Sequence, residues 1–314
     1  MRKLPGERQN LADAAFKLAT WFFAVFVLIL LGAVIVSLVE GSVEAFAKFG
    51  PAFVVTEVWN PARQNFGGLA PMVGTLVTSA IAMVFGIPIS FGIAVFLTQL
   101  CPVWARRPLG VGIELLAGIP SIIYGIWGLF VFAPFMQSYV EPFLIATLGR
   151  LPLIGVLFAG PPLGIGVLTA GIILGVMVLP FISSIMRDVF ETVPPMLKES
   201  AYGLGATTWE VMWNVVLPFT RVGVIGGIML GLGRALGETM AVTFVIGNAH
   251  RLSWSLLAPG TTISASLANE FTEAVDDIYQ SSLVALGMIL FVITLIVLSA
   301  AKYLLIRLQS RAGT

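Results

Sequence analysis

Residues 199–218 read ESAYGLGATTWEVMWNVVLP, and this stretch decides the fold because it lies between two long apolar runs. Gly205 predicts the end of one short helix. Thr207 and Glu210 have the spacing of a capping box, which predicts the start of a second helix. We therefore expect a helix, a glycine turn and a helix within the loop 188–221. The outer ends of the two helices are expected at Pro194-Pro195 and Leu217-Pro218.

The sequence on both sides of this loop is too apolar for a water-soluble protein. Of its 314 residues, 58% are hydrophobic and 11% are charged, and the mean hydropathy is +1.00. A helix needs about 20 apolar residues to cross a bilayer. We therefore expect an all-α integral membrane protein that forms a single domain over residues 1–314. The six predicted spans cover about 17–39, 72–99, 111–136, 162–186, 222–247 and 281–306.

The basic residues orient these spans. Most of the 17 Lys and Arg residues fall on the side that holds the loop 188–221 and both termini, whereas acidic residues dominate the other side. Because cytoplasmic segments of membrane proteins are enriched in Lys and Arg, the loop and both termini are predicted to be cytoplasmic.

Composition also excludes several kinds of site. One cysteine and one histidine cannot build a Cys/His metal cluster, so we expect no metal. A net charge of +1 gives no electrostatic signal for nucleic acid. The sequence has no G-x-x-x-x-G-K-[ST] phosphate-binding loop, so ATP hydrolysis would have to come from another polypeptide. We therefore expect that the chain is not itself an enzyme.

Span five carries two charged residues, Arg234 and Glu238. Each costs on the order of 2.5–3.5 kcal/mol at the centre of a membrane helix, so their presence needs a reason. Their spacing of four residues predicts an ion pair on one helix face. Gly223, Gly227, Gly231 and Ala235 share that arc, which therefore faces protein or a pore.

Two interpretations of this pair remain open. In the first, the small residues allow close helix packing and the ion pair locks it. In the second, Arg234 offers a forked donor to an oxyanion in a translocation pathway. Glu238 then either holds Arg234 paired when no substrate is bound, or accepts a proton from hydrogen phosphate and so discriminates against sulfate.

Other polar residues in the sequence give weaker signals. Glu114, just after Arg106-Arg107, is interpreted as an interfacial carboxylate near the start of span three, with a role at an inner gate as the alternative. Ser121 and Tyr124 follow Pro120, where a break in the helix would leave backbone groups free to line a cavity. His250 is expected to be an interfacial residue.

The cytoplasmic loop carries the first family resemblance. Glu199-Ser200-Ala201, then Gly205 and Val215-Val216-Leu217-Pro218, resemble the EAA loop of ABC importer permeases, in which E-A-A is followed after three residues by G and after nine more by I-x-L-P. Ser200 and Val215 depart conservatively from that pattern. The resemblance implies the type I ABC importer permease fold. It also implies that Glu199, Ser200, Ala201 and Gly205 couple the chain to an ATPase.

Two further stretches are similar to phosphate-specific ABC permeases of the PstC type, namely LAGIPSIIYG at 116–125 and GRALGETMA at 233–241. The resemblance implies a subunit that forms half of a phosphate pathway in the bacterial inner membrane, with Arg234 and Glu238 as transport residues. The implied partners are a PstA-like permease, two copies of a cytoplasmic ATPase that uses ATP and Mg, and an external phosphate-binding protein. No cofactor of its own is implied.

Three other functions fit parts of the sequence. A permease for molybdate, sulfate or phosphonate would share the fold and the loop. A proton-coupled secondary anion transporter would explain Arg234 and Glu238 but leave the loop without a purpose. A membrane scaffold or sensor that transports nothing would use the apolar loop but not the two charges.

Overall fold

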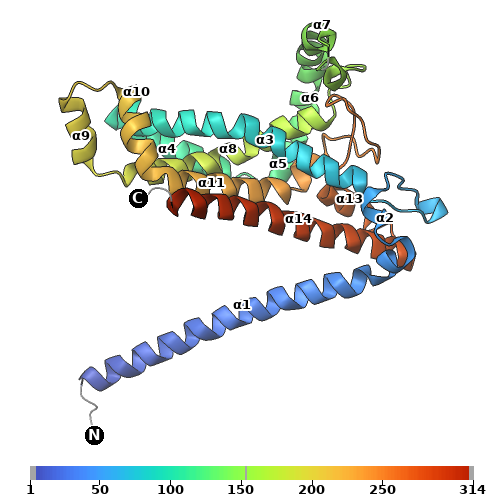
Figure 1. Cartoon of the computed structure of the whole chain (residues 1–314), viewed down its shortest axis with the longest axis horizontal. Helices are drawn as coiled ribbons and strands as arrows, with labels where there is room; N and C mark the ends of the chain where they lie inside the picture. The colour runs from blue at the N-terminus through green and yellow to red at the C-terminus, as the bar shows by residue number, and fades with distance from the viewer. Residues whose placement is uncertain (1–4, 153, 311–314) are drawn as a thin grey trace.

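The computed structural model describes residues 5–152 and 154–310 and is built almost entirely of helices (Figure 1). Within these residues, six segments are long and apolar enough to cross a membrane. These segments are Asp13–Phe49, Leu69–Leu100, Ser121–Arg150, Val167–Glu191, Thr208–Leu236 and Asp277–Arg307. The helices are α1 (Pro5–Phe49), α2 (Ala52–Val55), α3 (Leu69–Val95), α4 (Val103–Ala117), α5 (Ser121–Trp127), α6 (Ala133–Phe135), α7 (Glu141–Thr147), α8 (Val167–Glu191), α9 (Pro195–Gly203), α10 (Thr208–Val211), α11 (Leu217–Leu236), α12 (Met240–Thr243), α13 (Ile263–Glu270) and α14 (Asp277–Ser310).

Helix α8 lies at the centre of the molecule and packs along α3 and α11. Its side chains Leu174, Val178 and Ile182 are fully buried in the largest hydrophobic cluster. The glycines of α11 face α8 at close range, since a Cβ atom on Gly231 would lie 2.6 Å from Ile182. The row of small residues in span five is therefore a helix contact, as the packing interpretation expected.

The third predicted span differs from the structure. Instead of one helix over 111–136, α4 ends at Ala117 and a new helix begins at Ser121. Pro120 lacks an N–H group and disfavours the helical conformation at the residue before it, so the chain breaks here instead of bending. The continuous helical stretch after the break extends to Arg150, well beyond the predicted end.

The second helix of the loop 188–221 also differs from its prediction. It does not close at Leu217-Pro218, but continues through a π-helical turn at Met212–Val216 into α11. The wider turn accommodates the proline, which would otherwise clash within a regular helix. One helical segment therefore runs from Thr208 to Leu236.

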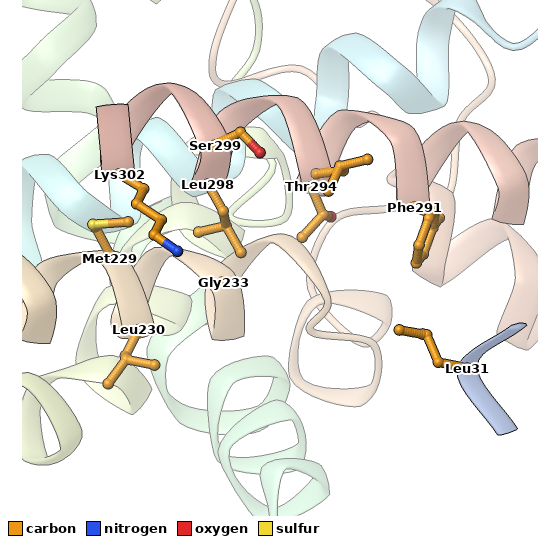
Figure 2. Close-up of a pocket in the computed structure, with 10 residues that line it drawn as sticks. Leu31, Met229, Leu230, Gly233, Phe291, Thr294, Leu298, Ser299 and Lys302 are labelled. Atoms are coloured by element: carbon orange, nitrogen blue, oxygen red, sulfur yellow. The ribbon is translucent and has the colours of Figure 1, made fainter. Parts of the chain in front are cut away.

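Helix α1 reaches away from the other helices over most of its length (Figure 1). It contacts α14 only near its C-terminal end, where the Ala45 N–H donates to Ser281 Oγ at 3.0 Å. An apolar cavity of about 670 Å³ lies between α1, α11 and α14. Figure 2 shows Leu31 of α1 on one side of it and Lys302 of α14 on the other.

Candidate functional site

Arg234 and Glu238 lie on two different elements of the structure. Arg234 is in the last turn of α11, whereas Glu238 follows Gly237, beyond the end of that helix. The predicted ion pair between them is wrong, because the helix that would place them on one face has already ended. Glu238 Oε1 instead accepts a hydrogen bond at 3.3 Å from the N–H of Ala241, in the first turn of α12.

The guanidinium of Arg234 is exposed on the isolated chain and has no carboxylate partner among the described residues. It lies over the ring of Phe181, 5.9 Å from the ring centre, and within electrostatic reach of the Tyr124 hydroxyl. A cation in the last turn of a helix is favoured by the helix dipole. The group is thus held in place by neutral neighbours and remains free to receive an anion.

The two sequence stretches 116–125 and 233–241 pack against each other. Helix α5 contacts α12, and Gly125 of α5 is buried there. A Cβ atom on Gly125 would lie 2.7 Å from the Phe244 ring and 3.2 Å from Ala241 Cα, so only glycine allows this approach. Two interrupted helices therefore meet beside Arg234.

Tyr124 bridges the first of these interruptions. Its hydroxyl donates to the Leu116 carbonyl at 2.9 Å, across the break at residues 118–120. Breaks of this kind expose backbone N–H and C=O groups, which membrane proteins tolerate where the chain lines a cavity or packs on protein. Ser121 begins α5 on the same side of the break and is half-buried.

The loop 188–221 forms the predicted hairpin. Helix α9 begins at Pro195, and Gly205 follows it with φ +90°, a left-handed conformation that favours glycine. Both hydrogen bonds of the capping box between Thr207 and Glu210 are present. Of the four residues expected to couple to an ATPase, Ala201 is half-buried and three are exposed. Those three are Glu199, Ser200 and Gly205.

The hairpin packs against the helix bundle on one side, here called the fixed side, and is exposed on the other, here called the free side. On the fixed side the Trp213 ring lies 6.0 Å from Phe91, which in turn lies 5.8 Å from Phe190 of α8. On the free side several large apolar side chains are exposed, led by Leu204 at 90%. A surface of this kind on a rigid support is typical of a docking site. The other exposed members are Met196, Leu197, Tyr202 and Trp209.

Two polar contacts were not foreseen in the sequence. Arg187 Nη2 pairs with Glu114 Oε1 at 2.6 Å and with Asp188 Oδ1 at 2.7 Å. Glu114 therefore links α4 to α8, and it lies near the C-terminal end of α4 instead of near the start of a helix. Because 73 residues separate Glu114 from Arg187, no local pattern could have revealed this pair.

The second unforeseen contact surrounds Glu270 at the opposite end of the molecule from the hairpin. Its carboxylate accepts hydrogen bonds from Trp59 Nε1 and the Tyr279 hydroxyl, each at 2.6 Å, and contacts His250 Nε2 at 2.5 Å. Burial acts to raise the pKa of Glu270, but these bonds more than offset it, so the pKa is lowered. No group of three or more His, Cys, Asp or Glu side chains able to hold a metal is found within 5–152 and 154–310.

The fold and the site together are those of a helical membrane permease. Interrupted helices surround Arg234, which has no carboxylate partner among the described residues, and the hairpin carries exposed apolar side chains. A family model described as "Binding-protein-dependent transport system inner membrane component" matches residues 86–310. The "Phosphate transport system permease protein PstC" of Mesorhizobium japonicum is 61% identical, with 98% of this chain and 94% of the relative covered. The protein of the same name from Haemophilus influenzae is 52% identical, with 97% and 96% covered.

Solved structures agree on the fold. An alginate ABC transporter chain has a TM-score of 0.59 at 17% identity, with 96% of both chains covered. A chain of the MetNI methionine ABC transporter has a TM-score of 0.55 at 18% identity, and the match covers 82% of this chain and 100% of the transporter chain. This chain therefore belongs to the binding-protein-dependent transport system inner membrane components, among the PstC-type permeases. It is a multi-pass inner-membrane transport subunit and not an enzyme.

Proposed function

We propose that this chain is the PstC-type subunit of an ATP-driven importer of inorganic phosphate and forms half of the translocation pathway, with Arg234 as the substrate-binding cation. The observation that carries this proposal is Arg234 at the meeting point of two interrupted helices, where it is exposed and has no carboxylate partner in the described part of the chain. A guanidinium presents parallel N–H donors that match two oxygens of a phosphate group. The names of the relatives support phosphate as the substrate.

Glu238 is proposed to distinguish phosphate from sulfate. Its carboxylate lies close to Arg234 in sequence but is not paired with it, and among residues 5–152 and 154–310 only the N–H of Ala241 donates to it. Hydrogen phosphate can donate a proton to this carboxylate, whereas sulfate has none to donate at neutral pH. A sulfate ion would therefore face an uncompensated negative charge.

A second permease completes the pathway in this proposal. The face of the isolated chain that carries Arg234 is open, and much of α4 beside it is exposed. A PstA-like subunit facing this surface would enclose the substrate between two chains and exclude lipid. Charged groups in a membrane are stabilised when they face such an interior.

The hairpin is proposed to couple this pathway to two copies of a cytoplasmic ATPase, which bind the ATP and Mg. Leu204 and its exposed apolar neighbours supply the docking surface, with Glu199, Ser200 and Gly205 at the contact. The helical segment from Thr208 to Leu236 then leads without interruption to Arg234. At 1.5 Å per residue it spans about 40 Å, enough to carry a movement of the hairpin across the membrane. An external phosphate-binding protein delivers the substrate.

Uptake of radiolabelled phosphate by the complete importer tests the pathway. We expect Arg234→Gln to reduce uptake by about 10- to 150-fold. This factor corresponds to the roughly 1.5–3 kcal/mol that the loss of a charge-assisted hydrogen bond to an anion costs. Glu238→Gln should keep phosphate uptake measurable but weaken the rejection of sulfate as a competitor. Arg221→Gln, at the other end of α11, serves as the matched control and should transport normally.

Copurification of the second permease and the ATPase must be unchanged in all three variants, so that a loss of uptake reports on the pathway. Normal phosphate uptake by Arg234→Gln would refute the assignment of this residue. Competition by molybdate or phosphonate at the level of phosphate would instead refute phosphate as the selected oxyanion. Uptake that continues after ATP depletion would favour a secondary transporter.

A further inference from the structure

A polar cavity lies at the end of α4 and α8 that is nearest to the hairpin. Its volume is about 310 Å³, and it is separate from the surroundings of Arg234. In the predicted orientation it opens to the cytoplasm or to the lipid headgroups of the inner leaflet. The charged residues that line it are Arg106, Arg107, Glu114, Arg187 and Glu191.

One of these cations is already neutralised. Arg187 pairs with Glu114 and Asp188 at 2.6 and 2.7 Å, and its side chain crosses α4 at Gly110, where a Cβ atom would lie 2.8 Å from Arg187 Nη1. This pair forms a wall of the cavity and fixes α4 to α8. It leaves Arg187 with little capacity for a further anion.

The other two arginines have no acidic partner within the described residues. Arg106 Nη2 donates to the Thr98 carbonyl at 3.2 Å, but its Nε is buried and has no hydrogen-bond partner. An unpaired buried donor on a charged group is costly unless a water or a ligand satisfies it. Arg107 is exposed and forms no ion pair in the described chain.

A third cation approaches from the hairpin. The pKa of Lys198 in α9 is lowered by burial and by the positive charge of Arg106, while Glu191 acts in the opposite direction. Within the described residues, the one hydrogen bond of Lys198 Nζ goes to the Phe190 carbonyl, at 3.3 Å. Arg106 and Arg107 line the cavity together with Glu191, and Lys198 lies within electrostatic reach of Arg106 and Glu191. Positive charge therefore exceeds negative charge here, which favours the binding of an anion.

We infer that this cavity binds a phosphoanion through Arg106, Arg107 and Lys198. The chemistry is shared by inorganic phosphate and by the phosphodiester headgroup of an anionic lipid, and both are present at this face of the membrane. A bound anion would connect α4 to α9 and so stiffen the base of the hairpin. The site is distinct from the pathway at Arg234, and the inference does not depend on what Arg234 binds.

Direct binding to the importer complex tests this inference. The complexes contain both permeases and the ATPase but not the external phosphate-binding protein, so that this protein does not bind the radiolabel. All of them carry Arg234→Gln, which removes any contribution of the pathway, and are placed in phosphatidylcholine nanodiscs without ATP. We expect radiolabelled inorganic phosphate to bind, and the double variant Arg106→Gln/Arg107→Gln to bind at least tenfold more weakly. Arg221→Gln, a basic residue outside the cavity, is the matched control and should bind as the parent does.

A second set of nanodiscs contains phosphatidylglycerol, and native mass spectrometry counts the lipids that remain bound. The site is assigned to a lipid headgroup if two results coincide. The parent retains phosphatidylglycerol but binds no free phosphate, and the double variant retains less phosphatidylglycerol than the parent. If the double variant does not assemble, Arg107→Gln alone replaces it, because this exposed side chain makes no ion pair or side-chain hydrogen bond with the described residues. Phosphate binding by this variant should fall severalfold. Binding of both anions that is unchanged in the variants overturns the inference.

Discussion

Glu270 connects three separate segments at the end of the molecule opposite the hairpin. It receives hydrogen bonds from Trp59 and Tyr279 and contacts His250, whose ring stacks on Trp59 with centres 4.9 Å apart. If the carboxylate were removed, Trp59, Tyr279 and His250 would each lose a buried hydrogen-bond acceptor. Each donor left unpaired would cost about 1–3 kcal/mol of folding stability. Glu270 is therefore a support for the outer segments and not a substrate group.

This support depends on pH in a defined direction. The pKa of Glu270 is lowered in the folded protein, so its stabilisation is fully present above the unfolded value of about 4.3 and is lost as the pH falls through the lower folded value. We expect the melting temperature of the parent to exceed that of Glu270→Gln at pH 7, and the difference to shrink below about pH 4.3. Thermal unfolding in detergent measures both.

Glu44→Gln provides the control for this comparison, because Glu44 is an exposed carboxylate of α1 outside the cluster. Its melting temperature should match that of the parent at both pH values. A difference between the parent and Glu270→Gln that stays constant or grows on acidification would contradict the role given to Glu270.

Single charged residues could be chosen from the sequence, but their partners could not. Arg234 and Glu238 stand out because charges are rare in apolar spans, yet their predicted ion pair fails since α11 ends at Leu236. Arg187 finds Glu114 on another helix, which no local spacing indicates. Ion pairs across a membrane protein follow from tertiary packing, and this packing is absent from the local pattern.

At the scale of helices, the contact between α8 and α11 depends on glycine. A Cβ atom on Gly231 would meet Ile182 at 2.6 Å and Val178 at 3.1 Å, and both are fully buried. We expect Gly231→Val to destabilise the protein by about 1–3 kcal/mol through overpacking. The measurement is the melting temperature of the purified importer.

Gly226 of the same helix is the matched control. A Cβ atom there meets nothing within 4 Å, so Gly226→Ala should be neutral, or stabilising by up to about 1 kcal/mol through helix propensity. Equal effects of the two substitutions would show that the glycines act through the backbone and not through the contact with α8.

A substitution on the exposed side of the hairpin is expected to weaken assembly with the ATPase without changing the stability of the chain. Leu204 is 90% exposed and contributes little to the fold, so Leu204→Asp should leave the melting temperature of the chain unchanged. It should nevertheless reduce copurification of the ATPase by tenfold or more, because a charge would enter an apolar contact. Val275→Asp, 87% exposed at the opposite end, should copurify normally. Retention of the ATPase by Leu204→Asp would exclude the hairpin as its docking site.

The helices themselves show which local signals suffice. Gly205 and the capping box of Thr207 and Glu210 predict the hairpin correctly, because turns and caps are decided by neighbouring residues. Prolines are less decisive. Pro120 breaks its span, whereas Pro218 is absorbed by a π-helical turn and the helix continues. The outcome depends on the surrounding packing, which hydropathy does not report.

At the scale of the whole molecule, much of the apolar surface has no partner within the chain. The most apolar part of α1 is entirely unburied, and Phe22, Phe23 and Leu28 are each more than half exposed. Such a helix is stable only against lipid or another membrane chain. The open face of α1 and the open face around Arg234 both suit a subunit that works within a larger complex.

The orientation of the whole chain gives the last prediction. Arg106 and Arg107 follow Val103, whereas Glu273, Asp276 and Asp277 surround Val275, so the positive-inside rule places these two valines on opposite sides. Both are well exposed, at 85% and 87%. In a Cys101→Ser background, which removes the single cysteine, we expect a membrane-impermeant maleimide to label Val275→Cys in intact spheroplasts. Val103→Cys should react only after permeabilisation. The reverse pattern would place the hairpin and the Arg106 cavity outside the cell, where no ATPase could reach them.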